Sequence, residues 1–244
     1  MSQFHTTVTG LVPACNMTIL KNLSNITKQI DIRCREIGRS TTNLKLLAVS
    51  KTWPAHQLRQ LAEAGQRDFG ENYLQEALEK IVLLQDLDLV WHFIGPIQSN
   101  KTKNIAENFQ WVHSLDREKI AQRLNQHRPA HYPPLNVCIQ LNIDNEASKS
   151  GISPQSLFDF AATIANYDRL CLRGIMIIPQ QKVSLETRKQ SFTKARDYYQ
   201  QLAQRFPNVD TLSMGMSADR DIALACGTTC LRVGTALFGE RTSH

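Results

Sequence analysis

Lys51 is the residue whose type and position most directly suggest chemistry. It follows an apolar run at residues 46–49, and Pro54 comes three positions later. A continuous apolar run is typical of a strand buried on both faces of a parallel sheet, and proline is favoured at the start of a helix. The sequence therefore predicts Lys51 just past the carboxyl end of a strand, where α/β folds place functional groups. Such an amine can react with a carbonyl group or bind a phosphate. The alternative is a lysine at a strand end whose ammonium group simply extends into solvent.

Two later segments have the composition of a phosphate-binding site. Residues 213–219 place small and hydroxyl side chains between a predicted strand and a helix, and residues 231–239 include Gly234 and Thr235. Backbone N–H groups at such helix starts bind anions, whereas N-capping by Ser217 is the simpler alternative. Because both segments follow the last two predicted strands, the sequence predicts that they form one phosphate site.

The lysine and the phosphate site become neighbours if the sheet closes into a barrel. The ligand would then carry a carbonyl at one end and a phosphate at the other, which fits pyridoxal 5′-phosphate (PLP) bound to Lys51 as a Schiff base. Arg232 would face the pyridine nitrogen. Since arginine only donates hydrogen bonds, this nitrogen would remain an unprotonated acceptor. PLP would then be a weaker electron sink than with an acidic partner, which argues against aminotransferase chemistry.

Three other polar residues lie at or near predicted strand ends. Asn72 follows the second strand and either caps the next helix or hydrogen-bonds a ligand. Lys149 lies in a long polar loop after the fifth strand, as a second pocket amine or a solvated side chain. His92 lies inside the third strand and is interpreted as a core histidine rather than a ligand.

The elements that must position these residues alternate regularly along the chain. Alternating strands and helices with short connections indicate parallel βαβ units. Eight strands predict a single (β/α)8 TIM-type barrel with an extra N-terminal helix; an open doubly wound sheet is the alternative, although no G-x-G-x-x-G motif follows a strand. The predicted strands are 44–49, 67–70, 89–94, 110–113, 135–143, 170–178, 209–212 and 229–233. The predicted helices between them are 54–64, 72–85, 98–108, 116–127, 154–166, 185–205 and 217–225.

One domain accounts for most of the chain. Residues 1–17 lack a periodic pattern and are predicted to be a loose N-terminal extension, with Met17 as a second candidate start. Residues 18–240 are predicted to form one PLP-binding (β/α)8 barrel domain, which begins with a helical pattern of apolar residues.

Composition excludes several classes of function. The 244 residues carry a net charge of +6, but the basic residues form no cluster longer than 101–103, so we expect no nucleic-acid partner. No apolar stretch approaches the roughly 20 residues of a membrane span, and no secretory signal is present. The six cysteines form no C-x-x-C pair and the histidines lack metal-ligand spacing. We expect a cytoplasmic monomer with reduced thiols and no metal site.

Several motifs, in this order, resemble those of the pyridoxal phosphate homeostasis protein family, and together they span roughly residues 22–240. They are Ala48-Val49-Ser50-Lys51, Phe69-Gly70-Glu71-Asn72-Tyr73, His92-Phe93-Ile94-Gly95, Asn100-Lys101, Ser148-Lys149-Ser150-Gly151, Ser213-Met214-Gly215-Met216-Ser217 and Arg232-Val233-Gly234-Thr235-Ala236-Leu237-Phe238-Gly239.

The resemblance implies a barrel like the N-terminal domain of alanine racemase, with PLP as an aldimine on Lys51. It implies that Arg232 bonds the pyridine nitrogen, that Asn72 lies beside the cofactor, and that Lys149 is linked to a second binding mode or to transfer. The phosphate would be bound by Met214 through its backbone, Ser217, Gly234 and Thr235. Family members are regarded as carriers or regulators of PLP supply without established turnover, so no catalytic residue is predicted. The partners implied are PLP and PLP-dependent apo-enzymes. Trp53 departs from the family, because many members have lysine there.

Two enzymatic alternatives remain open at this point. A PLP-dependent amino-acid racemase needs a second acid or base on the opposite face of the cofactor. In the fold-related racemases a tyrosine from a second domain supplies it; we expect that domain to be absent, and only Tyr73 lies near a strand end. A Schiff-base aldolase without cofactor would use Lys51 but leaves an inward-pointing Arg232 unexplained.

Overall fold

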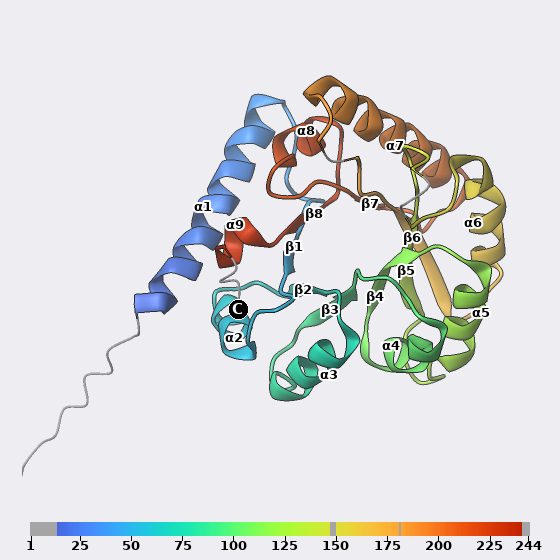
Figure 1. The fold of residues 1–244 in the computed structure, drawn as a ribbon, viewed down its shortest axis with the longest axis horizontal. Coiled ribbons are helices and arrows are strands. Elements are labelled where there is room, and N and C mark those ends of the chain that lie inside the picture. Colours follow the sequence, from blue (N-terminus) through green and yellow to red (C-terminus); the bar gives the residue numbers. More distant parts are fainter. Residues whose placement is uncertain (1–13, 147–149, 181, 241–244) are drawn as a thin grey trace, which may run out of the picture.

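Eight parallel strands close into a barrel in the order of the chain, with β8 beside β1 (Figure 1). A computed structural model describes residues 14–146, 150–180 and 182–240, with side chains from residue 18 onward. The predicted (β/α)8 TIM-type barrel is confirmed and the open sheet is excluded. The strands are β1 (Lys45–Val49), β2 (Asp68–Glu71), β3 (Val90–Phe93), β4 (Trp111–Leu115), β5 (Leu135–Gln140), β6 (Leu170–Met176), β7 (Thr211–Ser213) and β8 (Cys230–Val233).

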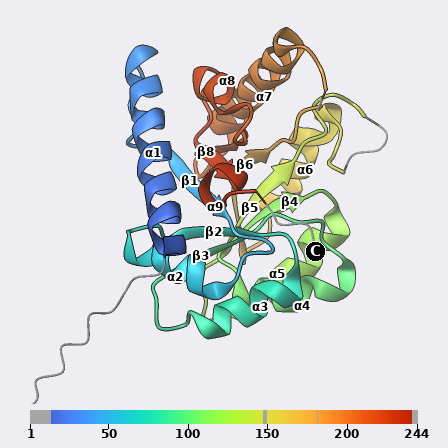
Figure 2. The same cartoon turned by 60° about the vertical axis from the view of Figure 1, so that its left-hand side comes forward.

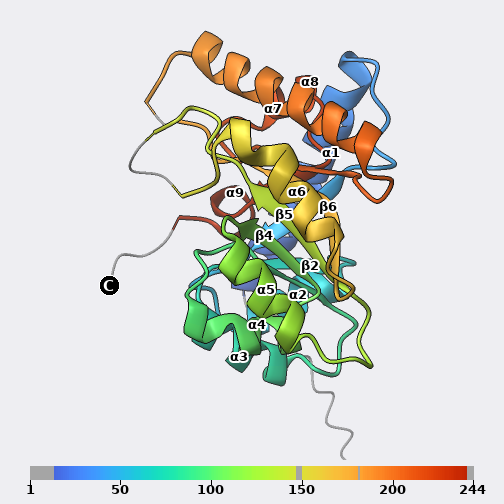
Figure 3. The same ribbon diagram turned by 90° about the vertical axis from the view of Figure 1, so that its right-hand side faces the viewer.

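Helices surround the strands on the outside of the barrel (Figures 1 and 3). In the described part of the chain they are α1 (Ala14–Glu36), α2 (Ala55–Glu63), α3 (Leu74–Leu83), α4 (Thr102–Asn108), α5 (Glu118–His127), α6 (Leu157–Ala165), α7 (Leu185–Arg205), α8 (Arg220–Ala225) and α9 (Thr235–Phe238). Short 3-10 helices, η1 (Ser99–Lys101) and η2 (Pro154–Ser156), precede α4 and α6.

Local sequence signals account for several of these boundaries. Pro54 precedes α2 in an extended conformation, where its missing N–H leaves no hydrogen bond unmade. Ser184 begins α7, and its hydroxyl accepts a hydrogen bond from the N–H of Thr187 at 3.1 Å, as a capping serine does. These signals place helix starts just beyond the loops that follow the strands.

The extra N-terminal helix is present and packs against α9, α8 and α2 (Figure 2). It begins at Ala14, so residues 14–17, which the sequence assigned to a loose extension, are helical; residues 1–13 lie outside the described residues. Ile19, Ile26 and Ile30 are buried at helical spacing. The side-chain amide of Asn22 donates to the carbonyl of Leu237 in α9 at 3.0 Å, which ties this helix to the segment after β8.

The apolar core lies mainly between the strands and the helices. Phe69, Phe109 and Phe192 are fully buried there. The barrel interior is different, because buried polar side chains replace much of the Val, Ile and Leu filling that is usual in such barrels. It holds a smaller apolar cluster, Trp111, Cys138 and Met176.

Among the residues that the structure describes, no helix combines the length and the apolar composition that crossing a bilayer requires. Within the same residues, no group of three or more His, Cys, Asp and Glu side chains is arranged to hold a metal ion.

Candidate functional site

Lys51 lies in a tight turn immediately after β1 and is half-buried. The N–H of Trp53 donates to the carbonyl of Ser50 at 3.1 Å, and the N–H of Ser50 donates to Gly70 in β2 at 3.0 Å. Thr52 has φ 69°, a left-handed conformation that non-glycine residues adopt only where the surroundings enforce it. The turn therefore holds the lysine backbone in one position at the carboxyl end of the barrel.

A buried ion pair beneath this turn provides that support. The Lys80 ammonium donates to the Ser50 carbonyl and to Glu71 Oε1, both at 2.7 Å, and also to Glu76. The Ser50 hydroxyl donates to the same Glu71 oxygen at 2.6 Å. Burial raises the pKa of Glu71, with the charge of Lys80 opposing that rise. Sequence reasoning gave Glu71 and Lys80 no role, because it did not foresee that a lysine of α3 reaches back to the end of β1.

Asn72 follows β2 directly and carries a buried acceptor. Its Oδ1 has no hydrogen-bond partner, and a buried polar atom of this kind calls for a ligand or other partner. The backbone at Gly95 comes so close that a Cβ there would lie 2.2 Å from the carbonyl oxygen of Asn72. Tyr73, not Asn72, occupies the N-cap of α3, and it makes no side-chain capping bond. The capping alternative for Asn72 is therefore wrong.

Arg232 points into the barrel from β8 and is 5% exposed. One terminal nitrogen, Nη1, donates to Ser213 Oγ, and the other, Nη2, donates to the carbonyl of Ile177, both at 2.8 Å. These bonds use two of its five N–H groups, so the guanidinium is fixed and retains donors for a ligand. The inward orientation that the sequence predicted for Arg232 is observed.

The turns after β7 and β8 meet at the candidate phosphate site. Ser217 Oγ accepts from the N–H of Ala236 at 3.5 Å. Within the described part of the chain, the amides of Gly234 and Thr235 have no acceptor. A Cβ on Gly234 would lie 3.5 Å from that of Val49 in β1, so this turn adjoins the strand that leads to Lys51.

Met214 does not offer the backbone donor that was predicted for it. Its N–H donates to the carbonyl of Cys230 at 3.2 Å, and its carbonyl accepts from the Thr228 hydroxyl at 2.7 Å. The side chain is fully buried. The residue continues the pairing of β7 with β8, so its polar groups are already used inside the fold.

Two aromatic rings join the lysine turn to the phosphate turns. Trp53 stacks on Phe238 of α9 with ring centroids 5.5 Å apart and an interplanar angle of 15°. Such offset stacking adds to the stability that burial alone gives. Trp53 therefore links the β1 turn to the helix after β8.

The predicted site residues thus gather at the carboxyl ends of four strands. Lys51 follows β1, Asn72 follows β2, Ser217 follows β7, and Gly234 and Thr235 follow β8. Lys149 lies outside the described residues. The unpartnered Asn72 oxygen, the donors of Arg232 and the free amides after β8 are suited to a flat, polar ligand that carries a phosphate.

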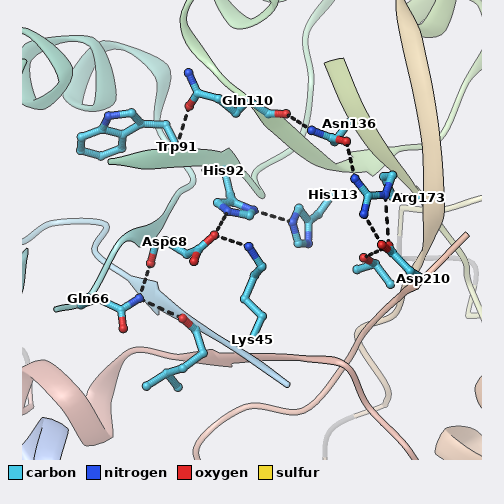
Figure 4. A network of polar contacts seen from close by, with 12 residues as sticks. Lys45, Gln66, Asp68, Trp91, His92, Gln110, His113, Asn136, Arg173 and Asp210 are labelled. Atoms are coloured by element: carbon cyan, nitrogen blue, oxygen red, sulfur yellow. Dashed lines mark hydrogen bonds and ion pairs between the residues drawn. The ribbon is translucent and has the colours of Figure 1, made fainter. Parts of the chain in front are cut away.

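A chain of buried polar side chains runs below this site and was not anticipated as a unit. His92 Nε2 lies 2.8 Å from Asp68 Oδ1, and His92 Nδ1 lies 2.9 Å from His113 Nε2 (Figure 4). His113 Nδ1 lies 2.9 Å from Ser213 Oγ. The interpretation of His92 as a satisfied core histidine is confirmed. The sequence signal for this arrangement was period-two spacing, which puts His92 and Ile94 on one face of the predicted third strand, and Trp111 and His113 on one face of the fourth. The spacing alone does not say which face of each strand points into the barrel.

Burial of these histidines predicts acid sensitivity. Burial lowers the pKa of His92 from 6.5 to about 4, against the opposing effect of Asp68. Between these pH values the unfolded chain binds a proton that the folded chain does not, so the free energy of unfolding should fall by about 3 kcal/mol as the pH drops through this window. Urea unfolding at a series of pH values measures this slope.

A matched pair of variants isolates the contribution of His92. In His92→Gln, the amide can accept from His113 and donate to Asp68, so the bonds are kept without a titrating ring. The slope should flatten in this variant and remain in His56→Gln, which removes an exposed histidine of α2. Equal slopes in wild type and His92→Gln would contradict the assignment.

Comparisons with known proteins show the family to which this chain belongs. The family model for "Alanine racemase, N-terminal domain" matches residues 22–242. A "Pyridoxal phosphate homeostasis protein" of Vibrio cholerae is 50% identical over 228 residues, covering 92% of this chain and 97% of its own length. A protein with the same name from Pseudomonas aeruginosa is 51% identical over 224 residues, covering 92% and 96%. The structure of PipY from Synechococcus elongatus with PLP bound is 34% identical, with a TM-score of 0.79, covering 91% of this chain and all of that one.

Proposed function

Because the chain belongs to the pyridoxal phosphate homeostasis protein family, we propose that it binds PLP and acts in the cytoplasm as a carrier or regulator of PLP supply. The observation that carries this proposal is the adjacency of two features on paired strands. Lys51 follows β1, and the free amides of Gly234 and Thr235 follow β8. An amine and an anion site that follow neighbouring strands suit a ligand that carries both an aldehyde and a phosphate.

The amine of Lys51 would hold PLP covalently. Its nitrogen would replace the aldehyde oxygen, which would leave as water with the two hydrogens of the neutral amine. The supported turn after β1 favours this linkage because the lysine backbone is already fixed by Ser50 and Trp53. No further reagent is needed, so binding and release differ only by the gain or loss of one water molecule.

The phosphate would be bound by Ser217, Gly234 and Thr235. Hydroxyl and amide donors at a turn of this kind stabilise an anion. Met214 would contribute only by continuing the strand, since its N–H is bonded to Cys230. Asn72, with its unpartnered oxygen, would lie beside the cofactor.

Arg232 at the pyridine nitrogen supports a binding role more than a catalytic one. When bound, PLP supplies an electron sink, and that sink is strongest with a protonated pyridine nitrogen. Arginine cannot give up its proton to that nitrogen. Tyr73, the tyrosine noted for the racemase alternative, is 57% exposed. We therefore propose that the protein is not an enzyme and that it acts as a monomer with PLP-dependent apo-enzymes as recipients.

A transfer assay tests this function. The protein is loaded with PLP, freed of excess cofactor, and mixed with a PLP-dependent apo-enzyme, with and without a trap for free PLP. We expect the apo-enzyme to regain activity in both cases, because handover through a complex avoids the trap. Recovery of activity only without the trap would overturn direct transfer.

A second experiment tests for catalysis. The loaded protein is incubated with L-alanine in heavy water, and deuteration of the α-carbon at catalytic rates would overturn the non-enzymatic role.

A further inference from the structure

Six polar side chains form one continuous chain through the barrel interior, from its amino end to the candidate cofactor site. The open amino end is a pocket of about 770 Å³, which Lys45 and Asp68 line at the starts of β1 and β2. From Asp68 the contacts pass through the two histidines of β3 and β4, and then to β7 and β8. The members, in order, are Lys45, Asp68, His92, His113, Ser213 and Arg232.

Burial separates the middle of this chain from water. His92, His113 and Ser213 are fully buried, whereas the Asp68 side chain is 19% exposed and that of Lys45 is 35% exposed. Figure 4 shows Lys45, Asp68, His92 and His113 pointing toward one another between the strands. The buried members hydrogen-bond to one another, and Arg232 also donates to the carbonyl of Ile177.

The Asp68 carboxylate, which can only accept, and two neutral imidazoles together determine where each proton lies. Arg232 can only donate, so Ser213 Oγ accepts from it and is free to donate its own hydrogen to His113 Nδ1. His113 then carries its proton on Nε2 and donates to His92 Nδ1. His92 in turn carries its proton on Nε2 and donates to the Asp68 carboxylate, which also accepts from Lys45. Every bond between Arg232 and Asp68 therefore points toward the carboxylate, which Lys45 approaches from the other side.

The charges around the chain agree with this direction. Burial lowers the pKa of both histidines, so both rings are neutral and each carries one proton. Burial alone would raise the pKa of Asp68, but the hydrogen bonds from His92 and Lys45 and the charge of Lys45 outweigh it and lower that pKa. The opposite direction would require a protonated Asp68 or a doubly protonated His92.

We propose that Asp68 is a positioning residue for Arg232, acting across the barrel through His92, His113 and Ser213. A carboxylate at the amino end orients both imidazoles, and these orient the Ser213 hydroxyl so that its oxygen lone pairs face the guanidinium. The inference rests on the proposed contact between Arg232 and the pyridine nitrogen of PLP. It makes the pocket at the amino end, where Asp68 is partly exposed, part of the machinery that sets the cofactor site.

Removing the Asp68 carboxylate should reverse the direction of the hydrogen bond between the two histidines. In Asp68→Ala, the Lys45 ammonium becomes the only charged neighbour of His92 Nε2, which must then accept a hydrogen bond. Both histidines would move their protons to Nδ1, and Ser213 Oγ would receive donors from both His113 and Arg232. Because the Ser213 oxygen is then shared between two donors, its bond to the arginine weakens, and we expect PLP to bind about tenfold more weakly.

Two measurements separate this inference from the proposed function. Ring-nitrogen NMR of the PLP-free protein, with labelled histidine, reports the tautomers directly. We expect protons on Nε2 of His92 and His113 in wild type, and on Nδ1 in Asp68→Ala. Titration with PLP, followed by the visible absorbance of the bound cofactor, then tests whether the change reaches the site.

Asp210→Ala is the matched control. Asp210 lines the same pocket, but it pairs with Arg173, and neither residue belongs to the six hydrogen-bonded side chains (Figure 4). Asp68→Asn retains shape and one acceptor, so it keeps the test available should Asp68→Ala fail to fold, with a mixture of tautomers expected. Unchanged tautomers in both Asp68 variants, or a PLP affinity that falls equally in Asp210→Ala, would overturn the inference. If wild type binds no PLP, the proposed function and the role of Asp68 toward it both fail, while the tautomers still report the direction of the chain.

Discussion

Replacing Lys51 by alanine is expected to abolish the visible absorbance band that the protein develops with PLP. The linkage between amine and aldehyde produces that band, and no other amine is held on the turn after β1. The variant should fold normally, because Lys51 is half-buried and its turn is held by backbone bonds of Ser50 and Trp53. The measurement is a PLP titration followed by absorbance, and reduction with borohydride followed by mass spectrometry identifies the labelled residue.

Two controls separate the linkage from charge and from general lysine reactivity. Lys51→Arg retains the positive charge but cannot form the linkage, so it should also lack the band. Lys103→Ala removes an amine on α4 whose side chain is 66% exposed, and it should leave the band unchanged. A full band in Lys51→Ala, with label on another lysine, would show that PLP is held elsewhere.

Replacing Lys80 by methionine should destabilise the protein by about 3–5 kcal/mol, the usual effect of leaving a buried charge without its partner. The Lys80 side chain is 5% exposed and that of Glu71 is 0% exposed, so water cannot replace the ammonium. The turn that carries Lys51 also loses its support, because Lys80 donates to the Ser50 carbonyl. Urea unfolding measures the loss of stability, and PLP titration measures the effect on the turn.

The pH dependence identifies Glu71 as the source of this loss. Burial already raises the pKa of Glu71 above its usual 4.5, and loss of the Lys80 charge raises it further. Above pH 4.5 the folded variant then holds a proton that the unfolded chain has released, so its stability falls as the pH rises. The difference from wild type should therefore be larger at pH 8 than at pH 5.

Matched variants complete this test. Adding Glu71→Gln to Lys80→Met removes the unpaired charge and should restore much of the stability. Asp86→Asn breaks the exposed ion pair with Arg59, whose side chains are 36% and 58% exposed, and it should change stability by no more than about 1 kcal/mol. Equal losses in Lys80→Met and Asp86→Asn would show that the buried pair adds nothing to stability.

The sequence predicted the order and kind of the elements well, because alternation of apolar runs with helical patterns depends only on local spacing. It placed one boundary wrongly at a point where a side chain bonds to the backbone. The fifth strand was predicted to reach residue 143 but ends at Gln140. Asn142 Oδ1 accepts from the N–H of Glu146 at 3.1 Å, and such local bonds compete with a sheet ladder.

The positions of the candidate residues were predictable where one residue lies at or near a strand end, and less so where they depend on register. Lys51 and Arg232 are recognisable from type and position alone. The engaged backbone of Met214 depends on how β7 pairs with β8. The bonds of Lys80 to Glu71 and of His113 to Ser213 join different elements. No local pattern specifies which of two neighbouring elements supplies such a partner.

The stacked rings of Trp53 and Phe238 have a consequence for selectivity by length. They join the turn of Lys51 to the helix that begins beside the phosphate turn, so neither end of the ligand site can move without the other. The span between the Lys51 amine and the amides proposed to bind phosphate would therefore be a fixed dimension of the fold. A ligand whose aldehyde and phosphate are farther apart than those of PLP could bind at Lys51 or at the amides after β8, but not at both. The protein would therefore select its ligand by length as well as by its chemical groups.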